Sequence, residues 1–277
     1  MNFFTKILVT LSLFLLLNTG TINASASDIS KAENLVKITV GATPSPHAEI
    51  LEAIKSELKT KGIELNIIVF TDYVQPNIAL ANGQIDANFF QHKPYLDDFN
   101  KNNHTNLVSA GSIHYEPLGI FPGKIDNINN LRRGSVITVP NDTTNEARAL
   151  LLLEKQNIIK IRENAGLNAT VFDIIENPKG IVIKELEAAQ LVRSLQDVAL
   201  AVINGNYALD AGLNALTDSI AKEDNDSIAA TSFANIIAVR SGDENRDEIK
   251  ILIDVLKSDF TKNFIENNYK GAVVPIF

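Results

Sequence analysis

The chain has 277 residues, of which 45% are hydrophobic and 21% charged. This composition suffices for one large domain or two smaller lobes and excludes a wholly disordered chain. The net charge of −8 disfavours a nucleic-acid or anionic-membrane binder, because such proteins present a basic face. The sequence has no cysteine, so we expect no disulfide, no thiol catalysis, no thiolate metal site and no cysteine-linked lipid anchor.

Residues 1–26 predict a cleavable export signal. Lys6 supplies a positive charge, residues 7–17 are almost continuously apolar, and Ala24-Ser25-Ala26 has the small-x-small pattern of a signal-peptidase site. The apolar run is too short to span a bilayer, although an uncleaved anchor or a buried N-terminal helix is the alternative. We therefore expect a periplasmic protein that begins near residue 27.

The first half of the remaining chain predicts alternating strands and helices. A strand at 37–40 is followed by Ser45 as helix N-cap and Pro46 as first helical residue, a helix that ends near residue 62, and a strand at 63–70. This βαβ unit implies a parallel sheet with a right-handed crossover. Further predicted elements are a helix at 73–82, a strand at 85–90, a helix at 93–100 and a strand at 107–114.

A second α/β series follows residues 117–122. Its predicted elements are strands at 136–139, 170–174, 198–203 and 233–239, and helices at 144–156, 185–195 and 247–267. Two halves of similar size predict an α/β fold of two lobes, with the ligand in the cleft between them. The expected boundaries are 27–117 with 234–277 for lobe I, and 118–233 for lobe II.

The segment 140–148 is the strongest candidate for an anion site. It follows a strand and opens a helix, and Thr143 and Glu146 have the spacing of a capping box. Arg148 and Asn145 lie three residues apart on one helix face near the positive end of the helix dipole. This combination suits a carboxylate or a phosphate, whereas the simpler interpretation is a capped helix with a solvated arginine.

A second candidate is the aromatic segment 85–95. Phe89 and Phe90 are neighbours on a strand and point to opposite faces, so one of them is free to meet His92 and Tyr95 at the carboxyl end of the strand. Together with Tyr73 these residues predict a box for an apolar side chain. The alternative is an ordinary aromatic core with a surface histidine.

Amides near residue 204 form a third candidate. Asn204 and Asn206 flank Gly205 after an apolar strand, which places amide groups at the cleft edge or merely forms a turn. Enzyme motifs are missing: the sequence has no GxSxG, HExxH, Walker A or GxGxxG after a strand. We therefore expect no catalysis, no cofactor and no metal site.

The order of five segments resembles one family, the methionine-binding substrate-binding proteins of ABC transporters, whose NlpA/MetQ-type members are lipoproteins. The segments are VGATPSPHAEILE (40–52), NFFQHKPYL (88–96), PNDTTNEARALLLLE (140–154), ELEAAQL (185–191) and NGNYA (204–208). The resemblance covers essentially the whole exported chain. It implies a two-lobe periplasmic-binding fold of type II that closes on a small amino acid and delivers it to a membrane permease. The cysteine that carries the family's usual lipid is missing from this sequence.

The resemblance also implies roles for single residues. Arg148 is expected to clamp the ligand carboxylate with help from Asn145, and Asn204 and Asn235 to meet the amino and carboxylate groups. The residues expected to enclose the side chain are Tyr73, Phe89, Phe90, His92 and Tyr95. The expected partners are methionine or a similar amino acid and an ABC permease, with the protein a monomer. The alternatives are another amino acid or a short peptide as ligand, a periplasmic enzyme on the same fold, or a sensor or adhesion protein.

Overall fold

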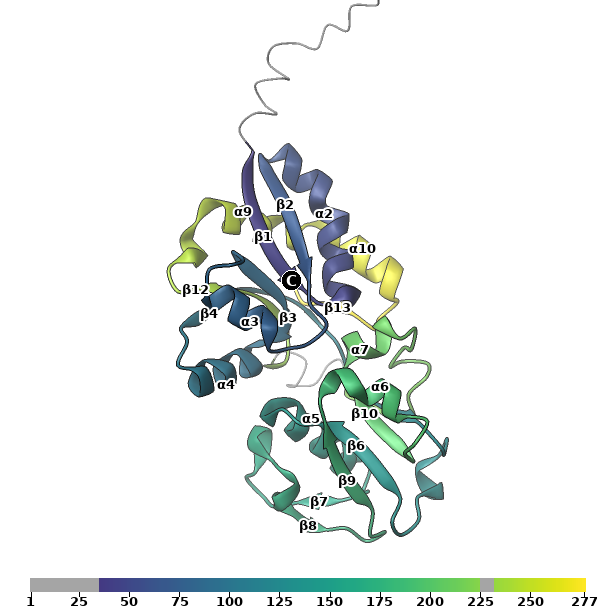
Figure 1. Cartoon of the computed structure of the whole chain (residues 1–277). Coiled ribbons are helices and arrows are strands. Elements are labelled where there is room, and N and C mark those ends of the chain that lie inside the picture. The colour runs from purple at the N-terminus through teal and green to yellow at the C-terminus, as the bar shows by residue number, and fades with distance from the viewer. Residues whose placement is uncertain (1–34, 225–231) are drawn as a thin grey trace, which may run out of the picture. The chain divides into compact units, whose positions relative to one another are not determined.

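The computed structural model describes residues 35–224 and 232–277, and the predicted export signal lies outside these residues. The described chain builds two large sheets, each with its own apolar core, and a small sheet of two strands (Figure 1). This confirms the α/β fold of two lobes. The boundaries given above for the lobes stay a prediction.

The first sheet has six strands in the order β13-β4-β12-β3-β1-β2. The strands are β1 (Val36–Ala42), β2 (Ile63–Val69), β3 (Ala87–His92), β4 (Leu107–Tyr115), β12 (Asn235–Arg240) and β13 (Val274–Pro275). Strand β1 is parallel to β2 and β3, which confirms the predicted βαβ unit. Strand β12 returns late in the chain and inserts antiparallel between β3 and β4. The sheet is therefore mixed.

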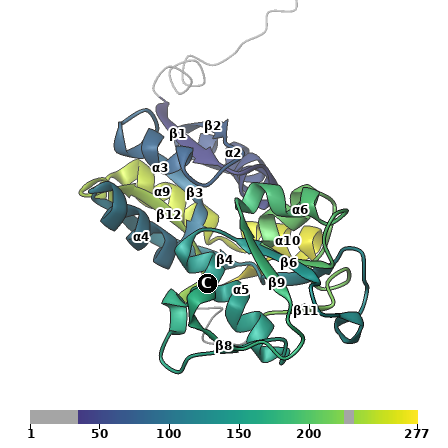
Figure 2. The same ribbon diagram turned by 60° about the horizontal axis from the view of Figure 1, so that its bottom comes forward.

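Helices cover both faces of this sheet (Figures 1 and 2). One face packs against α2 (Glu49–Thr60), α9 (Asp247–Leu256) and α10 (Asp259–Tyr269), and the other against α3 (Gln75–Ala81) and α4 (Lys93–Asn103). Apolar residues at helical spacing explain α2, because Ile50, Leu51, Ile54 and Leu58 are all fully buried.

The second sheet has five strands in the order β11-β5-β10-β6-β9. They are β5 (Gly119–Pro122), β6 (Val136–Pro140), β9 (Val182–Leu186), β10 (Leu200–Ile203) and β11 (Ala221–Lys222). Helix α5 (Thr143–Lys155) packs in one core cluster of this lobe, and α6 (Leu191–Ser194) and α7 (Gly205–Asp210) pack in another. A small pair of strands, β7 (Lys160–Ile161) and β8 (Ile174–Glu176), lies beside α5.

Short helical turns complete the described chain. They are the π-helical turn Pro44–Ala48 and the 3-10 turns Ile128–Asn130, Gly166–Asn168, Val171–Asp173, Ala188–Gln190 and Asp243–Asn245. The chain passes from the first sheet to the second through residues 116–118, between β4 and β5, and returns between β11 and β12. Within residues 35–224 and 232–277, no helix combines the length and the hydropathy that crossing a bilayer requires.

Three predicted elements are wrong in detail. The helix predicted at 247–267 is two helices, because Ser258 caps a new helix by accepting the backbone N–H of Thr261 at 3.3 Å. The helix predicted at 185–195 begins only at Leu191, after a strand and a 3-10 turn. The strand predicted at 170–174 is a 3-10 turn over Val171–Asp173 followed by β8.

Two predicted helix caps also differ. Thr43, and not Ser45, precedes the first turn of the helical segment that leads into α2. Asp142 is the N-cap of α5, since its carboxylate accepts the backbone N–H of Asn145 at 3.0 Å. Glu146 does not complete a capping box but accepts the backbone N–H of Val171 at 2.9 Å. It therefore ties the loop that precedes β8 to helix α5.

We predict that this buried carboxylate makes the stability of the protein depend on pH. Burial raises the pKa of Glu146 to about 7, so the folded protein holds a proton there that the unfolded chain releases at lower pH. Stability is therefore lost as the pH rises from about 4.5 to 7. Glu146→Gln keeps an acceptor for Val171 and removes the charge, so its Tm relative to wild type is expected to be roughly 2–4 °C higher at pH 8 than at pH 5.

Thermal unfolding followed by circular dichroism at the two pH values tests this prediction. The matched control is Glu154→Gln on the same helix, because Glu154 likewise accepts a backbone N–H, that of Ile161 at 2.8 Å. An equal difference in Tm at both pH values for Glu146→Gln would contradict the assignment.

Candidate ligand-binding site

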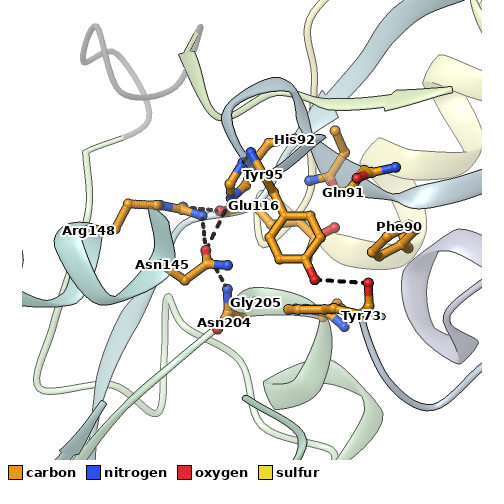
Figure 3. A pocket seen from close by; sticks show the side chains of 12 residues that line it. Tyr73, Phe90, Gln91, His92, Tyr95, Glu116, Asn145, Arg148, Asn204 and Gly205 are labelled. Atoms are coloured by element: carbon orange, nitrogen blue, oxygen red, sulfur yellow. Dashed lines mark hydrogen bonds between the residues drawn. The ribbon is translucent and has the colours of Figure 1, made fainter. Parts of the chain in front are cut away.

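A cavity lies where the two lobes meet, close to the residues that cross between them (Figure 3). The residues that line it come from elements of both lobes. The first lobe contributes Tyr73, the β3 residues Phe90, Gln91 and His92, Tyr95 on α4 and Asn235 on β12, and Glu116 lies in the segment that joins the sheets. The second lobe contributes Asn145 and Arg148 on α5, and Asn204, Gly205 and Asn206 around the start of α7. The space open to the centre of a water molecule is about 20 Å³, close to the minimum for one water. A larger ligand therefore requires the lining side chains to move apart.

All the residues predicted from the sequence line this cavity except Phe89. The Phe89 ring is fully buried on the other side of β3, 4.7 Å from the ring of His47 and 5.2 Å from that of His114. The alternation of side chains along a strand explains this, because only one of two neighbouring phenylalanines can face the cavity. The expectation that Phe89 encloses a ligand side chain is therefore corrected.

Arg148 is a buried cation with a buried partner. Its Nε and Nη2 atoms donate to the two carboxylate oxygens of Glu223 at 3.0 and 2.6 Å, and Nη2 also donates to the carbonyl oxygen of Glu116 at 3.3 Å. The guanidinium lies 4.3 Å from the centre of the Phe233 ring. The interpretation of Arg148 as a solvated side chain is wrong. Of its five N–H groups, only the two on Nη1 remain for the cavity side.

The two charges of this pair support each other. Burial opposes the charge on Arg148, but the neighbouring Glu223 carboxylate raises the arginine pKa above its usual value. Burial likewise favours neutral Glu223, yet the Arg148 charge and hydrogen bonds from Arg148, Tyr115 and the Leu118 N–H lower its pKa. Both groups are therefore ionised at neutral pH, and together they carry no net charge.

Asn145 connects the polar groups of both lobes (Figure 3). Its Oδ1 accepts from Asn204 Nδ2 at 2.9 Å, from His92 Nε2 at 3.1 Å and from Arg148 Nη1 at 3.2 Å. Its Nδ2 donates to both carboxylate oxygens of Asp142, at 2.9 and 3.0 Å. These contacts fix the orientation of the Asn145 amide, and they hold one N–H group of Arg148 at its Oδ1 atom.

His92 is neutral at this site. Its Nδ1 accepts the backbone N–H of Tyr95 at 3.2 Å, so the proton belongs on Nε2, which faces Asn145. Burial, and then the charge on Arg148, lowers the pKa of His92 to about 3. His92 therefore adds a neutral donor and an aromatic edge to the cavity and no charge.

Asn204 and Glu116 add two acceptor groups to the lining of the cavity. The Oδ1 atom of Asn204 is buried and has no hydrogen-bond partner among residues 35–224 and 232–277. Glu116 is buried as well, and burial raises the pKa of its carboxyl group although the Asn206 backbone N–H donates to it. A buried acceptor without a donor is costly in a folded protein, so this end of the cavity suits a ligand that brings N–H groups.

The opposite wall is aromatic. The Tyr73 ring lies 5.7 Å from that of Phe90 and 5.8 Å from that of Tyr95, and Phe90 and Tyr95 lie 6.0 Å apart. Gln91 closes this wall, and Asn77 and Asn88 hold its amide through hydrogen bonds of 2.7–2.8 Å. The aromatic character of this wall suits an apolar or thioether side chain.

Glu116 and Glu223 were not predicted from the sequence as residues of the site. A charged residue two positions after the strand predicted at 107–114 was the only signal for Glu116. Glu223 lies 75 residues from Arg148 in a stretch rich in glycine, asparagine and aspartate, and no spacing rule connects the two. Their positions follow from how the chain crosses between the sheets.

One buried group offers atoms of the types that metals bind. Ligand atoms of His47, His114 and Glu116 lie within 4.8 Å of one another. The Nε2 atom of each histidine already faces the same Glu116 oxygen, and His114 Nδ1 lacks the partner that normally orients a metal-binding imidazole. We therefore describe this group as a hydrogen-bonded cluster, and the expectation that the protein holds no metal stays a prediction.

Comparison with known proteins identifies the family. Residues 38–277 match the family model described as NlpA lipoprotein. The D-methionine-binding lipoprotein MetQ of Escherichia coli K12 is 40% identical over 240 residues, which are 86% of this chain and 87% of that protein.

Solved structures agree in fold. A lipoprotein from Ruminococcus gnavus has 53% identity and a TM-score of 0.86, over 87% of this chain and 99% of that one. A nutrient-binding protein from Burkholderia cenocepacia, bound to methionine, has 44% identity and a TM-score of 0.83, over 87% of this chain and 100% of that one. Both the sequence and the fold place this chain among those proteins. It belongs to the NlpA lipoprotein family.

Proposed function

We propose that this protein is the solute-binding component of an ABC importer, and that it binds methionine and delivers it to a membrane permease without catalysis. The observation that carries the proposal is the cavity itself, which combines a buried arginine, buried acceptors and an aromatic wall. A free amino acid with an apolar side chain needs these three features. The names of the similar proteins support methionine in particular.

The ligand carboxylate is assigned to Arg148. The Nη1 end of its guanidinium is turned toward the cavity, and the nearby start of α5 adds the positive end of a helix dipole. Nη1 now donates to Asn145 Oδ1. When a ligand binds, its carboxylate replaces this oxygen as the acceptor of the Nη1 hydrogen bond.

The ligand ammonium group is assigned to the acceptor end of the cavity. Asn204 Oδ1 lacks a donor, Glu116 supplies a carboxylate, and Asn235 presents an amide from the start of β12. An ammonium group has three N–H donors and a positive charge, so it can satisfy all three residues at once.

The ligand side chain is assigned to the wall of Tyr73, Phe90 and Tyr95. Thioethers make favourable contacts with aromatic rings, and the unbranched methionine side chain adapts to an irregular pocket. A ligand of about nine heavy atoms has a ceiling of about −13 kcal/mol, at roughly −1.5 kcal/mol for each atom. Nanomolar affinity is therefore within reach.

Lobe closure completes the proposed site. Tyr73 OH donates to Asn206 Oδ1 at 2.5 Å, and Tyr207 OH donates to the carbonyl oxygen of Thr71 at 3.2 Å, so residues of the first lobe bond directly to α7. A ligand enters when these contacts open and is enclosed when they re-form, as in hinge-bending binding proteins. We further propose export through residues 1–26 to the periplasm and function as a monomer.

Two other functions are outcomes of the tests. Binding of another amino acid or a short peptide would keep the carboxylate and ammonium contacts and change the side-chain pocket. A periplasmic enzyme would need a nucleophile or an acid–base pair, whereas the lining consists mainly of arginine, amides, aromatic rings and one carboxylate.

We predict that the affinity depends on all three parts of the ligand. Titration calorimetry with protein refolded free of ligand is expected to give tight binding of methionine. Methionine amide and 4-(methylthio)butanoate, which lack the carboxylate and the ammonium group, should each bind at least 100-fold more weakly, since each leaves a buried charged group unsatisfied. Equal affinity for either analogue, or no heat with any amino acid or dipeptide, would contradict the proposal.

We also predict that Arg148 carries the carboxylate contact. Arg148→Ala is expected to weaken methionine binding by roughly 2–5 kcal/mol, because the ligand charge loses its partner. Arg148→Lys keeps the charge but not the planar fork, and should recover part of this loss.

Arg162→Ala is the matched control for Arg148. Arg162 forms an ion pair with Asp173 on the surface of the same lobe, and its side chain is 68% exposed. Circular dichroism checks that each variant is folded. Unchanged methionine affinity in folded Arg148→Ala would remove this residue from the site.

A further inference from the structure

We propose that His47 and His114 are positioning residues. They hold the Glu116 carboxylate at the wall of the cavity, where it binds the ligand ammonium group. The proposal rests on the proposed function and goes beyond it, because neither histidine lines the cavity. Both side chains are completely buried, as is expected of groups that act through a third residue.

Hydrogen bonds fix the proton of His47. Thr43 Oγ1 lies 2.8 Å from His47 Nδ1, and Nε2 faces two oxygens, Asn235 Oδ1 at 3.2 Å and Glu116 Oε1 at 3.4 Å. Because a nitrogen between two acceptors must be the donor, Nε2 carries the proton and Nδ1 accepts from the threonine hydroxyl. His47 therefore presents an N–H group to Glu116 and Asn235.

The proton of His114 follows by the same reasoning. Its Nε2 lies 2.7 Å from Glu116 Oε1, whereas its Nδ1 is buried and has no partner in the described chain. A buried N–H group without an acceptor costs more than a buried lone pair, so the proton lies on Nε2. Both imidazoles thus direct an N–H group at the same carboxylate oxygen.

The other side of the carboxylate is confined by backbone. A Cβ atom on Gly205 would lie 2.8 Å from Glu116 Cβ and 3.1 Å from Oε2, so this position has no room for a side chain. The Asn206 backbone N–H also donates to the Glu116 carboxylate. With its Oε1 held by imidazoles and its other edge against Gly205, the carboxylate has one fixed orientation.

The donors hold the carboxylate without cancelling its charge. Burial lowers the pKa of His47 to about 4 and that of His114 to about 3, so both are neutral at pH 7. The second buried carboxylate near the cavity, that of Glu223, is neutralised by Arg148. Burial raises the pKa of Glu116, whereas the N–H groups that point at its carboxylate favour the charged form. Because neither histidine carries a charge, an ammonium group would be the counter-charge of this carboxylate.

The test compares two ligands on the full chain. Calorimetric affinities for methionine and for 4-(methylthio)butanoate are measured with wild type, His114→Leu and His114→Gln. His114→Leu is expected to lower the preference for methionine over the analogue by about tenfold or more, the size of one hydrogen bond to a charged group. His114→Gln, whose amide N–H can take the place of Nε2–H, should keep the preference within about threefold.

If His114 had a purely structural role, His114→Leu would weaken the binding of both ligands by the same factor, and that result would overturn the proposal. In the Glu116→Gln background the histidine change should leave the preference unaltered, and a further loss there would also overturn it. If His114→Leu does not fold, Gly205→Ala displaces the carboxylate without touching either imidazole and should lower the preference in the same way. Failure of wild type to bind methionine would instead refute the proposed function, and this inference with it.

Discussion

The buried ion pair between Arg148 and Glu223 is the interaction on which the rest of the site depends. A guanidinium inside a protein is tolerated only with a close counter-charge, and Glu223 supplies it through two hydrogen bonds. The same carboxylate accepts from Tyr115 and from the Leu118 N–H, at the point where the chain crosses between the sheets. One carboxylate therefore fixes both the arginine and the crossing. Because its two charges cancel, the ion pair fixes the position of the Arg148 N–H groups and adds no net charge to the site.

In the proposed site, the Glu116 carboxylate would let the protein distinguish the two ends of an amino acid. Arg148 offers directed N–H groups from a pair that is neutral as a whole, whereas Glu116 offers a negative charge surrounded by neutral donors. In the proposed site, Arg148 would receive the ligand carboxylate through charge-assisted hydrogen bonds, and Glu116 would attract the ammonium group by its charge. The aromatic wall of the proposed site would then select among the amino acids that satisfy both ends.

Local patterns in the sequence predicted the parts of the site that local structure determines. The period of the apolar residues predicted β1, α2 and β2, and the strand-to-helix junction before Arg148 predicted two residues that line the cavity, Asn145 and Arg148. Contacts between distant segments could not be predicted in this way: Glu223 lies 75 residues from Arg148, and β12 inserts between strands formed more than a hundred residues earlier. Serine is a common N-cap residue, so Ser258 could have indicated the start of a new helix. The helical spacing of apolar residues over 247–267 predicted a single helix instead. Only the resemblance to a family brought Asn235 into the predicted site.

The place of Glu116 in the chain has a mechanical consequence. It lies in the short segment 116–118 that joins the two sheets, so the lobe closure proposed above would bend the chain close to this residue. A force applied near an axis has almost no lever arm and produces little torque. Contact of Glu116 with the ammonium group of the proposed ligand would therefore contribute to recognition and little to closure. Closure would instead depend on contacts that join the two lobes directly, such as the hydrogen bond from Tyr73 OH to Asn206 Oδ1.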